Sequence, residues 1–186
     1  MATIHKLKIE LMTEESFAPF GELWDAADRP GDHRLSVPTG YTYQGRTAVN
    51  VIWQPHGGFT FNVLERHWGV TQSFIQLSGS PAVVCVAAPT PTEDPTDVPE
   101  PGDVRAFLID PAKGYSYKRG TWHCLNRHIL APPGATFVIL NSDPNPTQMV
   151  NYETGTGTIY RDLGSDAEPE TVEHARSYDT IFEITL

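Results

Sequence analysis

The sequence predicts a single all-β domain, on the strength of its strand-like segments and of its length. Seven short segments follow one another through the middle of the chain, each rich in β-branched or aromatic residues and bounded by Gly, Pro, Asn or Asp. Their period of two is that of strands rather than helices. A chain of 186 residues with so many strands predicts one sandwich or barrel spanning residues 1–186. The segments are 48–53, 59–63, 71–77, 82–87, 105–109, 115–118 and 136–140.

A short helix is expected near the N-terminus, in the segment 11–22, leading into a strand. Thr13 is a suitable N-cap, because its hydroxyl can accept a hydrogen bond from the first turn. Glu14 and Glu15 would occupy that turn, where the helix dipole favours acidic residues. Gly21 can end the helix.

The remaining segments predict loops and a C-terminal helix. Residues 25–40 are rich in Asp, Arg, Pro and Gly and predict a loop. Residues 167–176 predict a short amphipathic helix of one or two turns, and 180–186 predict a final strand.

A proline-rich insertion at 89–102 interrupts the series of strands. Proline cannot donate to a ladder and breaks helices, so the segment is expected to be a loop. A surface loop is favoured, and a lid over the mouth of the barrel is the alternative. The prolines are Pro89, Pro91, Pro95, Pro99 and Pro101.

Charge and composition exclude several classes of partner. The formal net charge is -10 and the pI is near 5.0, which opposes binding to nucleic acid or to an anionic membrane. No apolar run approaches the roughly 18 residues of a membrane span, and the N-terminus lacks the apolar core of a signal peptide, so we expect a cytoplasmic protein. Cys85 and Cys124 are expected to be free thiols in that compartment.

Four polar residues have the spacing of a metal site. Glu65 and His67 are two residues apart, so on an extended chain their side chains share a face, which Gln72 can rejoin. His123 follows the turn at Gly120 and supplies a fourth ligand. Two imidazoles, a carboxylate and an amide suit Ni, Mn, Fe, Co or Zn, with positions left for substrate. Taken singly, each is equally an ordinary hydrogen-bonded residue.

Further residues are candidates for catalysis or substrate binding. His123 and Lys118 are candidates for proton transfer, and Lys118 is otherwise part of a solvated turn. Arg105 would bind a substrate carboxylate or form an internal salt bridge. Cys124 is an unfavoured nucleophile, because it points away from the face of His123. The other histidines are expected to be solvated: His5, His33, His56, His128 and His174.

The spacing Glu65-x-His67-x4-Gln72, with Gly120-Thr-Trp-His123 later, resembles the two motifs of cupins, whose ligands are usually three His and one Glu. Together with further motifs it is similar to the ureidoglycolate lyases, small cupin-fold enzymes of purine (allantoin) catabolism. Those motifs are Thr13-Glu-Glu-Ser-Phe-Ala-Pro-Phe-Gly-Glu22, Leu64-Glu-Arg-His67, Thr71-Gln-Ser-Phe-Ile75 and Arg105-Ala-Phe107.

The resemblance implies a cupin-like β-barrel, or double-stranded β-helix, and a homodimer. It also implies a lyase that splits ureidoglycolate into glyoxylate and urea. The four polar residues would allow such an enzyme a divalent metal ion, and no organic cofactor is expected. Arg66, Gln76 and Arg105 are then the expected substrate contacts.

The chain departs from the resemblance at three places. Lys118 and Cys124 stand where similar proteins usually have histidines, and Asn141 begins a segment where an Asp-Arg pair is expected. Two alternatives therefore accompany the lyase: a cupin lyase, hydrolase or isomerase acting on another small hydroxy or oxo acid, and a non-catalytic cupin that binds a small ligand.

Overall fold

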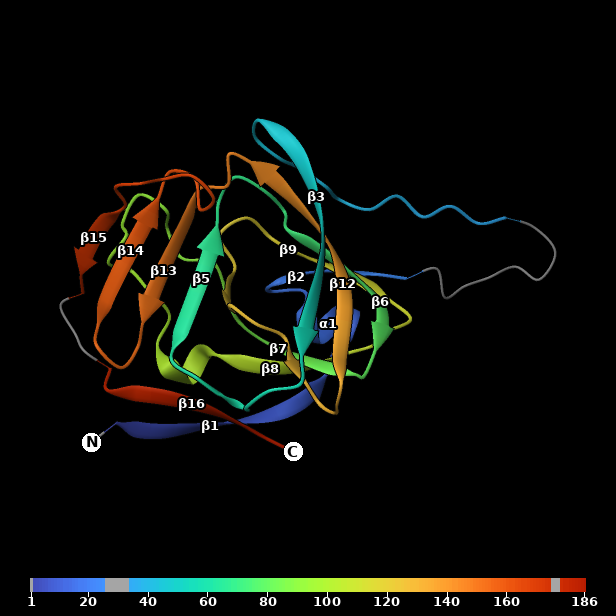
Figure 1. The fold of residues 1–186 in the computed structure, drawn as a ribbon, viewed down its shortest axis with the longest axis horizontal. Helices are drawn as coiled ribbons and strands as arrows, with labels where there is room; N and C mark the ends of the chain where they lie inside the picture. Colours follow the sequence, from blue (N-terminus) through green and yellow to red (C-terminus); the bar gives the residue numbers. More distant parts are fainter. Residues whose placement is uncertain (1, 26–33, 175–177) are drawn as a thin grey trace.

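The computed structural model describes residues 2–25, 34–174 and 178–186, and within them the chain is almost entirely β-structure. Figure 1 shows two curved sheets that curl around a common interior, which confirms the all-β, cupin-like prediction. The smaller sheet consists of β2 (Gly21–Trp24), β3 (Arg46–Pro55), β6 (Ser73–Gly79), β9 (Gly114–Tyr117) and β12 (Gly134–Asp143), in the order β2-β9-β6-β12-β3.

The larger sheet has eleven strands in the described residues. They are β1 (Thr3–Leu11), β4 (Thr60–Phe61), β5 (Val63–His67), β7 (Ala82–Ala87), β8 (Arg105–Ile109), β10 (Trp122–Cys124), β11 (His128–Ile129), β13 (Thr147–Asn151), β14 (Thr156–Tyr160), β15 (Glu170–Glu173) and β16 (Thr180–Thr185). Their order is β15-β14-β13-β5-β10-β7-β8-β1-β16-β4, with β11 paired to β7.

The N-terminal helix is present but shorter than the expected 11–22. Helix α1 (Glu14–Phe17) has Thr13 as its N-cap, and Ser16 N donates to Thr13 Oγ1 at 3.1 Å. Leu11 instead ends β1, which pairs in parallel with β16 and β8. Tertiary pairing therefore overrides helix propensity over the first residues of that segment.

The predicted C-terminal helix at 167–176 is wrong for the residues the structure describes there. Strand β15 forms instead and pairs antiparallel with β14, so that Val172 lies opposite Gly157 and is buried. Strand β15 needs only one buried apolar residue, because backbone hydrogen bonds to β14 hold it at the edge of the sheet. A helix here would need a whole apolar face. Residues 175–177 of the predicted helix lie outside the described residues.

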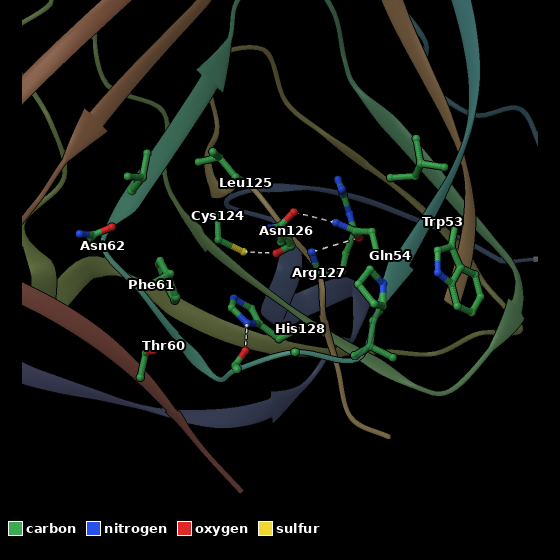
Figure 2. Close-up of a pocket in the computed structure, with 16 residues that line it drawn as sticks. Trp53, Gln54, Thr60, Phe61, Asn62, Cys124, Leu125, Asn126, Arg127 and His128 are labelled. Atoms are coloured by element: carbon green, nitrogen blue, oxygen red, sulfur yellow. Dashed lines mark hydrogen bonds between the residues drawn. The ribbon is translucent and has the colours of Figure 1, made fainter. Parts of the chain in front are cut away.

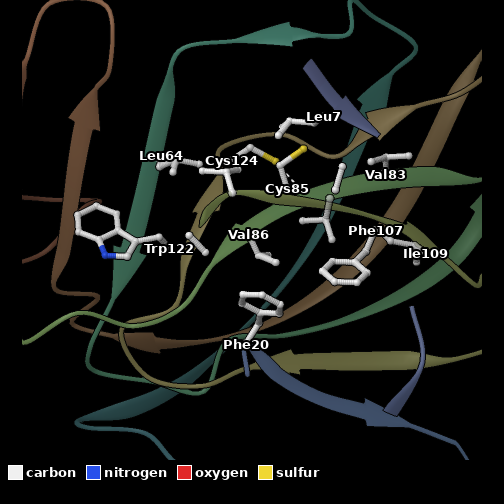
Figure 3. Close-up of a cluster of buried hydrophobic side chains, with 14 of the residues drawn as sticks. Leu7, Phe20, Leu64, Val83, Cys85, Val86, Phe107, Ile109, Trp122 and Cys124 are labelled. Atoms are coloured by element: carbon white, nitrogen blue, oxygen red, sulfur yellow. Dashed lines mark hydrogen bonds between the residues drawn. The ribbon is translucent and has the colours of Figure 1, made fainter. Parts of the chain in front are cut away.

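The apolar core packs against the larger sheet. All six residues of β7 are buried, because both faces of this strand are covered. Figure 3 shows side chains that meet around it, among them Phe107 of β8, Trp122 of β10 and Phe20 from the turn before β2. Phe17 of α1 is completely buried and meets the rings of Phe20 and Phe107.

The proline-rich segment 89–102 is fastened to the outside of the larger sheet. Arg66 points away from the face of Glu65, and its Nη1 donates to the carbonyl and the hydroxyl of Thr90, each at 2.9 Å. Its Nε and Nη2 donate to Gln148 Oε1, and Gln148 Nε2 donates to Pro95 O at 2.7 Å. These bonds support the surface-loop interpretation over the lid. The segment ends in a 3-10 turn, Pro101–Asp103.

Among the described residues, no helix is long and apolar enough to cross a membrane.

Removing the anchor of this loop should expose it to cleavage. Arg66→Met leaves the Thr90 carbonyl and Gln148 Oε1 without their donor, at a cost of about 1–3 kcal/mol. We expect a glutamate-specific protease to cut at the exposed Glu93 roughly tenfold faster or more, because local opening becomes less costly. Arg119→Ala, at an exposed arginine, is the control. Equal cleavage rates in wild type and Arg66→Met would contradict the anchoring role.

Candidate active site

Pairing of β5 with β10 assembles the centre of the site. His123 lies directly opposite Glu65 in this antiparallel pair, and His67 shares the face of Glu65 because it is two residues along β5. Glu65 Oε1 lies 3.8 Å from His67 Nε2 and 3.7 Å from His123 Nδ1. One ligand atom from each of the three residues lies within 4.8 Å of the other two.

The hydrogen bonds of the two imidazoles fix which nitrogen is free. The Thr147 hydroxyl donates to Asn145 O at 3.0 Å, so it accepts from His67 Nδ1 at 2.7 Å. His123 Nδ1 lies 3.1 Å from the carbonyl of Cys124, which only accepts. Each Nε2 is therefore a lone-pair acceptor, and neither has a hydrogen-bond partner among the described residues.

Burial sets the protonation states. Burial would raise the pKa of Glu65, but its interactions with His67, His123 and Arg127 outweigh this and lower it. Burial lowers the pKa of His123 to about 3, although the neighbouring Glu65 opposes that shift. At neutral pH the site therefore combines an ionised carboxylate with a neutral His123.

This donor set fits a divalent metal ion. The acceptor Nε2 of His67 faces the acceptor Oε1 of Glu65 at 3.8 Å, a juxtaposition that is unfavourable without a proton or a cation to share. Gln72 is also buried, and its side-chain oxygen has no partner in the described part of the chain. Imidazole, carboxylate and amide donors together match borderline metals.

A cavity of about 620 Å³ is lined by residues that neighbour this cluster in the sequence. Its wall includes Val63, two residues before Glu65, and Cys124, directly after His123, but the cluster itself lies outside the wall. Figure 2 shows how Gln54 organises the opposite side: its Nε2 donates to Asn126 Oδ1 at 3.0 Å, and its Oε1 accepts from Arg127 N at 3.2 Å.

Arg127 connects the cavity with the cluster, although it belongs to none of the motifs described above. It lines the cavity, is 6% exposed, and places its guanidinium 3.8 Å from the ring centre of Phe74. Its positive charge helps to lower the pKa of both Glu65 and His123. Its Nε has no hydrogen-bond partner among the described residues. The signal was an Asn-Arg-His run that begins three residues beyond His123 in a largely apolar region.

Three of the expected catalytic or substrate contacts face elsewhere. Lys118 is exposed, and its Nζ donates to Ala18 O at 2.5 Å, because β9 ends before it and the chain turns outward. Arg105 forms the internal salt bridge, with Nε donating to Glu10 Oε1 at 2.8 Å. Arg66 holds the outer loop, because alternation along β5 turns it away from Glu65.

Gln76 remains inside the barrel. It lies on the same face of β6 as Phe74, with Nε2 donating to Ser80 O at 2.8 Å. Its Oε1 has no partner in the described residues, so this residue keeps its place as a candidate contact.

The prediction that His128 is exposed to solvent was wrong. It is 7% exposed, and its Nδ1 lies 3.0 Å from Gly58 O. His33 lies outside the described residues.

Comparison with known proteins identifies one family. The family model described as ureidoglycolate lyase matches residues 4–155. A ureidoglycolate lyase of Rhodobacter capsulatus is 34% identical over 146 residues, covering 71% of this chain and 82% of the relative. A ureidoglycolate lyase of Pseudomonas aeruginosa is 36% identical over 132 residues, covering 63% of this chain and 73% of the relative.

One solved structure also matches over part of its length. RmlC from Streptococcus suis, in complex with dTDP-D-xylose, has a TM-score of 0.35 and 12% sequence identity. The match covers 75% of this chain and 61% of that chain.

Acidification should destabilise the metal-free protein through His123. The unfolded imidazole takes up a proton below about pH 6.5, whereas the buried one has a pKa of about 3. Between these two values the unfolded state binds more protons than the folded state. The free energy of unfolding therefore decreases as the pH is lowered, by up to about 1.4 kcal/mol per pH unit. Urea unfolding with a chelator, from about pH 7 to 4.5, measures this slope.

His123→Gln is the matched variant for this measurement. It lacks the buried imidazole, so its stability should change less steeply with pH than that of wild type. Other titrating groups, including His128 and His174, are common to both proteins and cancel in the difference. Identical slopes would contradict the low pKa of His123.

Proposed function

Because the chain belongs to the ureidoglycolate lyase family, we propose that it cleaves ureidoglycolate to glyoxylate and urea, as a step of allantoin and purine catabolism. The family match includes every residue of the candidate site, from Glu65 to Arg127. One observation carries the proposal: a carboxylate with a lowered pKa and two imidazoles converge in the barrel, and the buried Arg127 lines a cavity whose wall also includes Cys124, the neighbour of His123.

We assign metal binding to Glu65, His67, Gln72 and His123. The set offers two imidazoles, a carboxylate and an amide oxygen, which supports Ni, Mn, Fe, Co or Zn. When bound, such an ion would act as a Lewis acid on the oxygens of the substrate. No organic cofactor is invoked for the reaction.

Arg127 is the proposed partner of the substrate carboxylate. A guanidinium that is buried against Phe74 gains most from an anion, because charge-assisted bonds strengthen where water is excluded. Arg127 lies in the cavity wall, so a substrate whose carboxylate it binds would occupy this cavity. Gln76 is a second candidate contact, through its free Oε1.

The reaction requires one proton to leave and one to arrive. The carbinol hydroxyl loses its proton as the aldehyde forms, the carbon-nitrogen bond breaks, and its electron pair stays on the urea nitrogen, which is protonated. Glu65 is the ionised acceptor in the cluster, and His123 Nε2 is the acceptor in a metal-free mechanism. Burial raises the pKa of Tyr117, whose ring stacks on His123 at 4.5 Å, so its hydroxyl stays protonated and can serve as donor.

A glyoxylate-release assay with metal analysis tests these assignments. We expect wild type to carry about one ion at this cluster and His123→Ala to lose it, with kcat/KM for ureidoglycolate reduced roughly 100-fold or more in His123→Ala and Glu65→Gln. Arg127→Met should raise KM roughly 10- to 100-fold, as loss of a charged contact implies. Lys118→Ala should stay within about threefold of wild type, because its ammonium faces Ala18.

Other results would change the assignment in specific ways. Glyoxylate release that depends on His123 but survives metal removal would leave the lyase standing and contradict the ligand set. Metal without glyoxylate would show the barrel serving another small acid. A ligand recovered unchanged after long incubation would replace the lyase by a binding protein.

We further propose that the protein is a cytoplasmic homodimer. The outer face of β3, β6 and β12 is apolar in register, with Val51 opposite Val138 and Val138 opposite Ile75. Such a face is typical of a sheet covered on both sides, and a second copy would cover it with the same surface. Its exposed members are Val49, Val51, Trp53, Ile75 and Leu77. The two free, buried thiols, Cys85 and Cys124, support a reducing compartment.

A charge placed in this face should separate the subunits. Val51 is 66% exposed in the single chain, so Val51→Asp leaves the fold intact but puts a carboxylate into the proposed interface. Light scattering after gel filtration should give twice the chain mass for wild type and the chain mass for Val51→Asp. Ile4→Asp, at an exposed residue of β1, should remain dimeric. A monomeric wild type would contradict the proposal.

A further inference from the structure

A second cluster of metal-ligand side chains lies on the other face of β10. Cys124 directly follows His123, so its side chain points away from the carboxylate cluster. Cys85 lies on β7, and His128 is the first residue of β11. Strands β10 and β11 both pair with β7. One ligand atom from each of Cys85, Cys124 and His128 lies within 4.8 Å of the other two, and all three residues are buried.

The histidine of this cluster has a free nitrogen. The carbonyl of Gly58 only accepts, so His128 Nδ1 carries the hydrogen that it donates at 3.0 Å. This leaves Nε2 as a lone-pair acceptor with no hydrogen-bond partner among the described residues, on a side chain that is 7% exposed. Metal-binding histidines are characteristically oriented in this way, with the second nitrogen held by a carbonyl.

The two sulfurs are equally well arranged. Figure 3 shows Cys85 and Cys124 side by side, and the backbone N–H of Cys85 donates to Cys124 Sγ at 3.2 Å. A backbone donor of this kind stabilises a thiolate. Cys124 Sγ also lies 2.9 Å from Asn126 O, the acceptor for its hydrogen while the thiol is protonated.

We propose that Cys85 Sγ, Cys124 Sγ and His128 Nε2 bind a thiolate-preferring divalent ion, with Zn²⁺ the foremost candidate. Binding displaces the two thiol protons to solvent, with no change of oxidation state. Two sulfurs and one imidazole are three of the four ligands of tetrahedral zinc. Cys124 and His128 also line the 620 Å³ cavity, so the fourth position opens to water or to a small ligand there (Figure 2).

The two clusters differ in chemistry as well as in position. The interior cluster around Glu65 and His67 offers nitrogen and oxygen, whereas the cluster of Cys85, Cys124 and His128 offers mainly sulfur, which zinc prefers over manganese or magnesium. His123 and Cys124 face opposite sides of one strand, so the same ion cannot use both. This inference is independent of the lyase reaction and of metal at the interior cluster.

Cobalt substitution of the full-length protein tests the site. Co²⁺ bound to thiolates gives a strong near-ultraviolet charge-transfer band, which nitrogen and oxygen donors do not give. We expect the metal-free wild type to develop this band with Co²⁺ and to lose it on addition of Zn²⁺. His123→Ala, which damages only the interior cluster, should keep the band.

Two variants separate a ligand role from a structural one. His128→Asn keeps a side-chain amide in place of Nδ1, and therefore the bond to Gly58, but lacks Nε2; we expect it to lose the band. Cys124→Ser should lose it as well. If either variant fails to fold, as judged by circular dichroism, the wild-type spectrum alone still decides.

Three results would overturn the proposal. One is Co²⁺ binding to wild type without a charge-transfer band. Another is a band that appears only with Co²⁺ in large excess and is not displaced by equimolar Zn²⁺, which would be an adventitious ion only. The third is an intact mass two hydrogens lighter than the reduced chain, which would show a disulfide between Cys85 and Cys124.

Discussion

The pairing of β5 with β10 is the constraint on which the rest of the site depends. In the register of this pair, His123 lies directly opposite Glu65, although 58 positions separate the two residues along the chain. A slip of one residue would turn His123 outward and bring Cys124 or Trp122 to the carboxylate. Both neighbours of the pair restrain it, because β13 holds the other edge of β5 and β7 holds the other edge of β10.

Because side chains alternate along β5 and β10, the two faces of the sheet carry different functional groups. On the inner face are the carboxylate and the imidazoles; on the outer face Arg66 lies 4.5 Å from the ring centre of Trp122 and fastens the proline-rich segment. Burial lowers the pKa of Arg66 to about 10, while the acidic residues of that segment oppose the shift. The loop and the site are thus built from the same two strands, and the loop's bonds help to hold the register that the site requires.

Local patterns were sufficient to predict what depends on local chemistry. The strands around β7 and β8 and the N-cap at Thr13 follow from alternation and capping, and the interior cluster follows from the spacing of Glu65 and His67. What local patterns missed or left open depends on distant partners. Only the ladder with β14 makes 170–173 a strand, and only Glu10 on β1 decides that Arg105 forms a salt bridge. Arg127 lies beyond any motif, and the fold alone brings its guanidinium over Phe74.

The charges of the interior explain why an anionic substrate suits this barrel. Among the described residues facing the site, Glu65 contributes one negative charge and Arg127 one positive charge, while His123, with its pKa lowered to about 3, is neutral. A divalent ion held by the cluster would leave the interior strongly positive where water is largely excluded, which is costly. A substrate carboxylate would reduce that excess and would give the Arg127 guanidinium an anionic partner. With that ion bound, the same balance would disfavour neutral ligands, so the charge of the site would favour small acids before any shape-specific contact is made.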